Sequence, residues 1–165
     1  MPDIIVIAHN IRSTHNVGAI FRTAEGFGIS KIILSGYTPY PQTNSDTRLP
    51  HIAEKLTKQI SKTALGAEAI VPFEYLELPP LDELKTDGYT VIALEQAENS
   101  IALAHYSPPQ KVALLLGEEV EGITKELLAQ CEAIIEIPMV GKKESFNVSV
   151  ATGIALYALT TDASI

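Results

Sequence analysis

The backbone groups and side chains best suited to forming a ligand pocket lie in residues 137–151. An apolar strand is expected over 133–137, followed by a flexible turn, the polar residues Ser145 and Asn147, and an apolar helix over 148–159. A turn of this kind leaves backbone N–H and C=O groups free beside the start of a buried helix. The segment can therefore bind a ligand mainly through its main chain, with two small hydrogen-bonding side chains close by.

A second candidate is the segment 117–122, Gly-Glu-Glu-Val-Glu-Gly, which follows the apolar run 111–116. Its glycine spacing is that of a P-loop, but Ile123 stands where a phosphate-binding lysine is needed, and the three glutamates would repel a triphosphate. No Gly-x-Gly-x-x-Gly follows the first predicted strand, so a dinucleotide site loses its main support. Two interpretations remain, a close backbone approach to a ligand at Gly117 or a plain strand-to-helix turn with surface glutamates.

A third candidate is Asn-Val-Gly-Ala-Ile-Phe-Arg over residues 16–22, at the start of a predicted helix. Asn16 is a suitable N-cap for this helix. Gly18 and Arg22 are four residues apart, and helical side chains lean toward the N-terminus, so we expect Arg22 to lie across the gap at Gly18. The alternative is an exposed ion pair between Arg22 and Glu25.

In this order, the three segments resemble the three signatures of the SpoU/TrmH family of RNA ribose methyltransferases, in the SPOUT superfamily. The resemblance extends over residues 3–160; each motif is weak alone, and the combination is specific. Phe146 departs from the family's usual leucine or methionine, and we expect it to keep the backbone contacts while altering the pocket's shape. The resemblance implies an α/β domain with a deep trefoil knot in its C-terminal part. It also implies a homodimer with the site near the subunit interface.

The implied reaction is transfer of a methyl group from S-adenosylmethionine, without a metal, to a ribose 2′-hydroxyl of tRNA or rRNA. The resemblance assigns activation of the hydroxyl to Arg22, with Asn16 orienting Arg22 or the ribose. Ser145 and Asn147 would shape the reacting end. Because a guanidinium is protonated at any ordinary pH, Arg22 can instead hold the adjacent phosphate and stabilise the developing oxyanion, with phosphate or water accepting the proton.

Seven residues are expected around the cofactor, mostly through backbone groups: Leu94, Leu116, Gly117, Glu119, Ile137, Met139 and Phe146. Of these, Glu119 is expected mainly to orient its own loop.

The positions of these residues depend on an alternation of strands and helices along the chain. Apolar, β-rich runs predict strands over residues 3–8, 31–35, 68–72, 89–95, 111–116 and 133–137. Helical patterns are found over residues 16–28, 51–63, 82–87, 125–131 and 148–159. Apolar strands separated by helices are typical of a mostly parallel sheet flanked by helices, and such sheets bind ligands beyond the carboxyl ends of their strands.

Length and composition favour a single domain over residues 1–165 with a substantial core. No separate RNA-binding domain is expected, which leaves RNA recognition to this domain, to a second subunit or to a partner. The single cysteine, Cys131, argues against structural zinc and for a reducing compartment. The start lacks a leader pattern and no run of 18 apolar residues occurs, so a cytoplasmic protein without a membrane segment is expected.

Charge is distributed unevenly along the chain. Residues 1–62 carry seven Lys/Arg and four acidic residues, net +3, whereas residues 63–165 carry five and sixteen, net −11. The first third, joined by Lys142 and Lys143, can form a basic face for RNA, or these can be ordinary solubility charges. Tyr37 and Tyr40 can stack on a base or pack their loop against its own domain.

Two rival functions remain to be weighed against the methyltransferase. A catalytically silent RNA-binding or assembly subunit would keep the same fold, but the intact Asn16, Arg22, Glu119, Ser145 and Asn147 count against it. A small-molecule nucleotide-binding protein is disfavoured because the chain lacks a phosphate loop.

Overall fold

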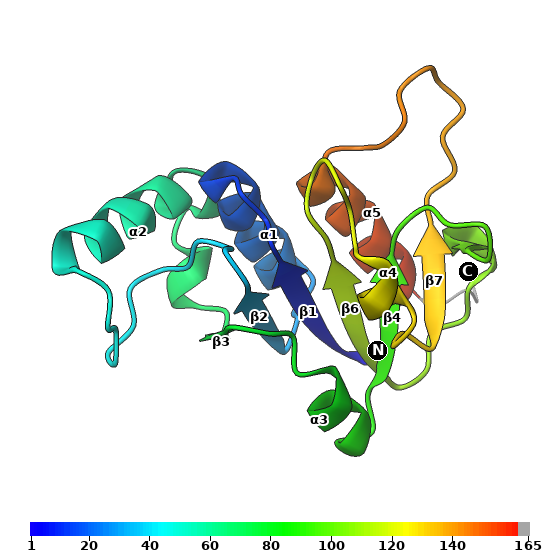
Figure 1. The fold of residues 1–165 in the computed structure, drawn as a ribbon, viewed down its shortest axis with the longest axis horizontal. Coiled ribbons are helices and arrows are strands. Elements are labelled where there is room, and N and C mark those ends of the chain that lie inside the picture. The colour runs from blue at the N-terminus through cyan, green and yellow to red at the C-terminus, as the bar shows by residue number, and fades with distance from the viewer. Residues whose placement is uncertain (162–165) are drawn as a thin grey trace.

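A computed structural model describes residues 1–161 of the chain and places seven strands in one sheet (Figure 1). The strands are β1 (Asp3–His9), β2 (Lys31–Ser35), β3 (Phe73–Leu76), β4 (Thr90–Leu94), β5 (Ile101–Ala102), β6 (Lys111–Leu116) and β7 (Ala133–Glu136). Their order in the sheet is β3-β2-β1-β6-β4-β7-β5, and every paired neighbour runs parallel. The expected mostly parallel α/β fold is confirmed.

Helices cover both faces of this sheet, namely α1 (Thr14–Gly26), α2 (Pro50–Ala64), α3 (Leu81–Thr86), α4 (Lys125–Leu128) and α5 (Val148–Thr160), with 3-10 turns η1 (Ala67–Ala69) and η2 (Leu103–His105). Along β1, Ile4 and Val6 pack in a core with α1, α2 and α5, while Ile5 and Ile7 pack in a second core with α3 and α4. Alternate residues of a strand point to opposite faces, so both faces of β1 are buried. This explains why the strands are apolar without interruption.

The strand order decides where the site can form. β6 lies between β1 and β4, and β7 pairs with the other side of β4. Because these four strands are parallel, the loops after residues 9, 94, 116 and 136 all leave from the same edge of the sheet. The three signature segments begin at or near this edge. The trefoil knot stays a prediction.

Most predicted elements are found with boundaries shifted by one to three residues, and two differences are larger or bear on the site. The strand expected over 68–72 is wrong: η1 occupies part of that run, and β3 begins only at Phe73. Gly66 turns the chain with a φ of +96°, and Val71 is buried before Phe73 packs edge-to-face on Phe21 with ring centroids 5.5 Å apart. The contact of Phe73 with α1 thus accompanies the strand where the chain actually forms it.

The second difference is at the start of α1, which begins at Thr14 and is capped by Ser13. The prediction of Asn16 as N-cap is therefore wrong, and its carboxamide is available for other contacts. The sequence patterns do not predict the short elements β5 and η2 either. Within residues 1–161, no helix is long and apolar enough to cross a membrane, and no group of three or more His, Cys, Asp or Glu residues is placed to hold a metal ion.

Candidate functional site

A cleft of about 170 Å³ opens at the carboxyl ends of β4, β6 and β7. Its walls come from residues 94–96, 116–122 and 136–137, and from the start of α5 with the two residues Ser145 and Phe146 before it. The cleft lies where ligands usually bind in parallel α/β sheets.

Two glycines allow the loop after β6 to fold tightly. A Cβ atom on Gly117 would lie 2.4 Å from Cγ1 of Ile123, which excludes any side chain there. Gly122 has a φ of +72°, and a Cβ on it would lie 2.2 Å from Oε2 of Glu95. That Glu95 oxygen accepts a hydrogen bond from the Ile123 N–H at 3.0 Å. The glycine spacing that resembles a P-loop therefore serves to fasten this loop to the end of β4.

The cleft is acidic. Four glutamates contribute to its walls: Glu95, Glu118, Glu121 and Glu136. The side chain of Glu118 is only 6% exposed, it accepts hydrogen bonds from the N–H groups of Val120 and Glu121, and its Oε1 lies 2.9 Å from Nε of Arg12. That contact is an ion pair without hydrogen-bond geometry. A site surrounded by carboxylates disfavours phosphates and favours a cationic ligand.

A chain of hydrogen bonds joins the three signature segments. Glu119 accepts from the N–H of Arg12 at 3.1 Å, from the N–H of Ser13 at 3.2 Å and from Nδ2 of Asn16 at 3.1 Å. Oδ1 of Asn16 accepts from Nδ2 of Asn147 at 3.1 Å. Burial alone raises the pKa of Glu119, but these donors outweigh it and hold the pKa below its ordinary value. Glu119 therefore connects its own loop to the start of α1.

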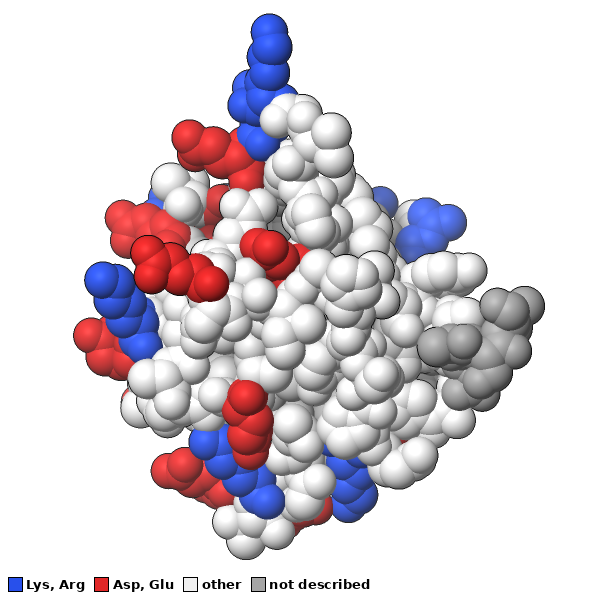
Figure 2. All heavy atoms as spheres, turned by 90° about the vertical axis from the view of Figure 1, so that its right-hand side faces the viewer, with Lys and Arg blue, Asp and Glu red and all other residues white. Residues whose placement is uncertain are grey.

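Asn147 has a second role as the N-cap of α5. Its Oδ1 accepts from the N–H of Ser149 at 2.9 Å and from the N–H of Val150 at 3.4 Å. The segment before it, residues 138–147, forms an exposed loop between β7 and α5 that includes Lys142 and Lys143. Figure 1 shows this loop rising above the sheet, and in Figure 2 basic side chains stand at the same end of the molecule, with acidic side chains lower on that face.

The residues predicted to bind a cofactor are largely brought together. Five of the seven line the cleft: Leu94, Leu116, Gly117, Ile137 and Phe146. Glu119 and Met139 are not part of its lining. The lining residues that the sequence does not single out include Glu95, Gln96, Glu118, Glu121 and Ala151. Glu95 and Gln96 end or directly follow the predicted strand 89–95, so their position at a carboxyl end is a usable signal.

Among the predicted catalytic residues, only Ser145 lines the cleft, while Asn16 and Asn147 lie beside it in the hydrogen-bonded chain. Arg22 is exposed on α1. The expectation that Arg22 lies across the gap at Gly18 is wrong, because a Cβ on Gly18 would meet α2 at 2.2 Å from the carbonyl oxygen of Ile60. Among residues 1–161, no ion pair joins Arg22 to Glu25.

The comparison with known proteins agrees with the order and geometry of these segments. Residues 3–157 match the model of the SpoU rRNA methylase family. The chain belongs to this family. Over 157 residues, 31% are identical to the tRNA (guanosine(18)-2'-O)-methyltransferase TARBP1 of Mus musculus, covering 95% of this chain and 9% of the mouse protein.

Two solved structures of RNA-modifying proteins share the fold. The TrmH/SpoU tRNA modifying enzyme of A. aeolicus has a TM-score of 0.78 and 26% identity, covering 97% of this chain and 75% of that one. The AdoMet-bound rRNA methyltransferase from Sinorhizobium meliloti has a TM-score of 0.77 and 26% identity, covering 94% of this chain and 55% of that one. The chain thus spans only a small part of the mouse protein and little more than half of the Sinorhizobium protein.

Proposed function

We propose that this SpoU-family chain transfers a methyl group from S-adenosylmethionine to a ribose 2′-hydroxyl of tRNA or rRNA. The observation that carries the proposal is the hydrogen-bonded chain Glu119–Asn16–Asn147, which joins the three signature segments beside an acidic cleft. The names of the related proteins support an RNA substrate, and one of them names the 2′-oxygen.

The residues of the cleft fit this cofactor. S-adenosylmethionine carries positive charge on its sulfonium and its amino group, and the four cleft glutamates suit a cation. Gly117 contributes to the lining of the cleft, and Phe146, 41% exposed, offers a ring edge or face to the adenine. We infer that Leu94, Leu116 and Ile137 complete an apolar surround for the adenosine, while Met139 and Glu119 act from outside the lining.

When bound, the cofactor supplies a methyl group already attached to a good leaving group, so the protein must mainly position the acceptor oxygen. A neutral hydroxyl is a poor nucleophile and needs a partner for its proton or its developing charge. We infer that Arg22 binds the neighbouring phosphate and stabilises the developing oxyanion, since a guanidinium does not release its proton at neutral pH. Asn16 orients the ribose, and Ser145 and Asn147 shape the reacting end.

A homodimer is part of this proposal. On α5, Val150, Ile154 and Tyr157 are 51%, 38% and 62% exposed, and with Gly153 they line a groove against α1. The α1 wall of this groove is formed by Ala19 and Thr23. An exposed apolar stripe on a helix favours burial against another chain, and a two-fold contact would pair this stripe with its own copy. Arg22 adjoins Thr23 on α1, so it would lie at the margin of such an interface.

Calorimetric titration with S-adenosylmethionine and with S-adenosylhomocysteine tests the proposal. We expect saturable binding of about one ligand per chain, because each chain has one such cleft at its signature segments. Methylation of unfractionated tRNA or rRNA, followed by nuclease digestion, would then place the methyl group on the ribose. A folded sample that binds neither ligand, with or without RNA, would overturn the proposal and favour the catalytically silent RNA-binding subunit.

A further inference from the structure

A second hollow lies at the carboxyl ends of β1 and β2, outside the acidic cleft. Its lining includes three tyrosines and two arginines, Tyr37, Tyr40, Tyr75, Arg12 and Arg48, with residues of α2 at one side. Aromatic rings and guanidinium groups are the side chains with which proteins bind single-stranded nucleic acid. Which of these groups are available to a ligand is decided by their contacts within the chain.

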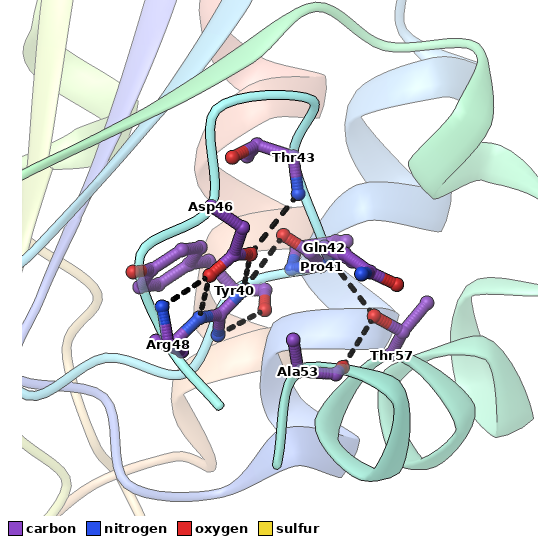
Figure 3. Close-up of polar contacts among 8 residues, drawn as sticks. All are labelled: Tyr40, Pro41, Gln42, Thr43, Asp46, Arg48, Ala53 and Thr57. Carbon is purple, nitrogen blue, oxygen red and sulfur yellow. Dashed lines mark hydrogen bonds and ion pairs between the residues drawn. The ribbon is translucent and has the colours of Figure 1, made fainter. Parts of the chain in front are cut away.

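Arg48 and Tyr40 stabilise the loop over residues 36–49, between β2 and α2, so their side chains are not available to a ligand (Figure 3). Nε of Arg48 donates to Oδ1 of Asp46 at 2.8 Å, and its Nη1 donates to the carbonyl oxygen of Tyr40 at 2.9 Å. The guanidinium carbon lies 3.5 Å from the centroid of the Tyr40 ring, and Tyr75 stacks on the same ring with centroids 4.2 Å apart. Two planar groups this close cannot share one face, so both faces of Tyr40 are covered.

The far end of the same loop is fastened to α2. The N–H of Gln42 donates to Oγ1 of Thr57 at 2.8 Å, and that hydroxyl donates to the carbonyl oxygen of Ala53 at 2.8 Å (Figure 3). The N–H of Thr43 donates to Oδ2 of Asp46 at 3.1 Å. The loop lines the hollow and is held in place by hydrogen bonds within itself and to α2.

Tyr37 is placed differently, because its ring is exposed while its backbone is held. It is 54% exposed and lines the hollow. Its N–H donates to Oδ1 of Asn10 at 3.1 Å, and the neighbouring carbonyl of Gly36 accepts from the hydroxyl of Tyr75 at 2.7 Å. On the other side, the buried hydroxyl of Thr38 has one proton to share between two main-chain oxygens, one in β1 at 3.0 Å and one in β2 at 2.7 Å. A ring presented on fixed backbone loses little entropy when it binds a ligand.

Arg12 connects this hollow to the acidic cleft. Its side chain is 65% exposed and lines the hollow, whereas its ion-pair partner Glu118, 2.9 Å away, lines the cleft. The two sites are therefore separated by a single ion pair. The α2 helix beside the hollow adds three exposed lysines on one helical face: Lys55, Lys58 and Lys62. These cations favour an anionic ligand on the side of the hollow that faces away from the cleft.

We propose that the hollow binds one unpaired nucleotide of the RNA, close to the nucleotide that is methylated, with its base stacked on Tyr37 and its phosphate beside Arg12. The inference rests on the RNA-methylating function proposed above and adds a recognition subsite to it. The base must be unpaired and splayed from its neighbours, because a base stacked within a helix has no free face for the ring. The subsite thus directs the enzyme to loops and other single-stranded positions.

Tryptophan fluorescence can report this stacking directly. The chain contains no tryptophan, so a Tyr37→Trp variant carries a single fluorophore at the subsite. We expect octaadenylate to quench that fluorescence in a saturable manner. The matched control is Tyr89→Trp, because Tyr89 precedes β4 at the amino-end edge of the sheet, where its hydroxyl donates to Asp3. Octaadenylate should leave the fluorescence of the control variant unchanged.

Affinities measured by calorimetry complete the test. Tyr37→Ala should bind octaadenylate roughly 5- to 150-fold more weakly than the wild type, the range expected for loss of one stacked base, while Tyr37→Phe should keep most of the affinity. Both variants should bind S-adenosylmethionine as the wild type does. Equal binding of octaadenylate by Tyr37→Ala and wild type, or no binding by either, would overturn the subsite and leave the methyltransferase proposal standing. Failure of the wild type to bind S-adenosylmethionine would instead count against the methyltransferase.

Discussion

Asn147 donates a side-chain hydrogen bond to Asn16 at 3.1 Å, although 131 positions separate them in the sequence. Asn16 in turn donates a hydrogen bond from its Nδ2 to Glu119, also at 3.1 Å. A carboxamide offers an acceptor and two donors, so it can connect a donor on one side to a carboxylate on the other. The start of α1, the loop after β6 and the start of α5 are thereby held in one arrangement.

Substitutions of Asn147 separate its two roles. Asn147→Ala removes the N-cap of α5 and the bond to Asn16, and we expect it to lower the free energy of unfolding by about 1 kcal/mol. Asn147→Asp keeps a cap acceptor at a helix N-terminus and should retain most of the stability, but its carboxylate cannot donate to Asn16. Urea denaturation measures the first effect, and methyl transfer to RNA should fall in both variants. Equal destabilisation by the two substitutions would contradict the assignment of the cap.

The stabilising hydrogen bonds of Glu119 are expected to require an ionised carboxylate. Glu119→Gln replaces one acceptor oxygen by a donor, so at least one of the N–H partners from Arg12, Ser13 or Asn16 loses its bond. We expect a loss of about 1 kcal/mol of stability at neutral pH for this half-buried group. Glu121→Gln is the matched control, since it makes the same chemical change in the same loop on an exposed residue. A similar loss in the control would show that the loop tolerates no amide, irrespective of the hydrogen bonds.

The same bonds predict a pH dependence. The folded pKa of Glu119 is depressed below its ordinary value of 4.5, so the folded state binds fewer protons at this group than the unfolded state. Its stabilising contribution is therefore fully present above about pH 4.5 and is lost as the pH falls through the folded pKa. The difference in unfolding free energy between wild type and Glu119→Gln should shrink below that pH. A difference that stays constant down to the acid transition would indicate a cause other than ionisation.

How much of this site follows from the sequence depends on the range of the contacts. The apolar runs predict most of the strands' approximate positions because both sheet faces are buried, and the signature residues predict which loops gather. The sequence does not reveal that Glu118 pairs with Arg12, because their proximity depends on β6 lying beside β1. Helical periodicity also does not predict which neighbouring element covers a helix face. The space at Gly18 is filled by α2 and not by Arg22.

Arg22 should affect turnover and not cofactor binding. It does not line the cleft, so Arg22→Ala should bind S-adenosylmethionine with unchanged affinity in a calorimetric titration. Methyl transfer from tritiated cofactor to unfractionated tRNA should fall by about 100-fold or more if the guanidinium stabilises developing charge. Arg22→Lys keeps the charge without the planar fork and should recover only part of the rate. Lys125→Ala serves as the control for loss of one exposed cation, and wild-type turnover by Arg22→Ala would remove Arg22 from the chemistry.

The apolar stripe on α5 should determine the oligomeric state. Ile154→Glu places a charge in the proposed interface, where burying it without a partner is costly, so sedimentation velocity should show a monomer in place of a dimer. Ile70→Glu makes the same substitution at an exposed isoleucine beyond η1 and should leave the dimer intact. A wild-type protein that is monomeric at all concentrations, or an Ile154→Glu variant that still dimerises, would place the contact elsewhere or remove it.

The loop between β7 and α5 should contribute to RNA affinity through Lys142 and Lys143, which are both exposed. Replacing both by alanine should weaken binding of unfractionated tRNA at every salt concentration. The slope of log affinity against log salt should become shallower by about 0.7 to 0.9 for each phosphate that the variant no longer neutralises. A double variant of Lys111 and Lys125 removes the same charge from two other exposed positions and serves as the control. Equal weakening of RNA binding in the two double variants would mean that only net charge matters. An unchanged salt slope in the Lys142 and Lys143 variant would place the RNA surface elsewhere, and Arg12 and the lysines of α2 would be the next positions to test.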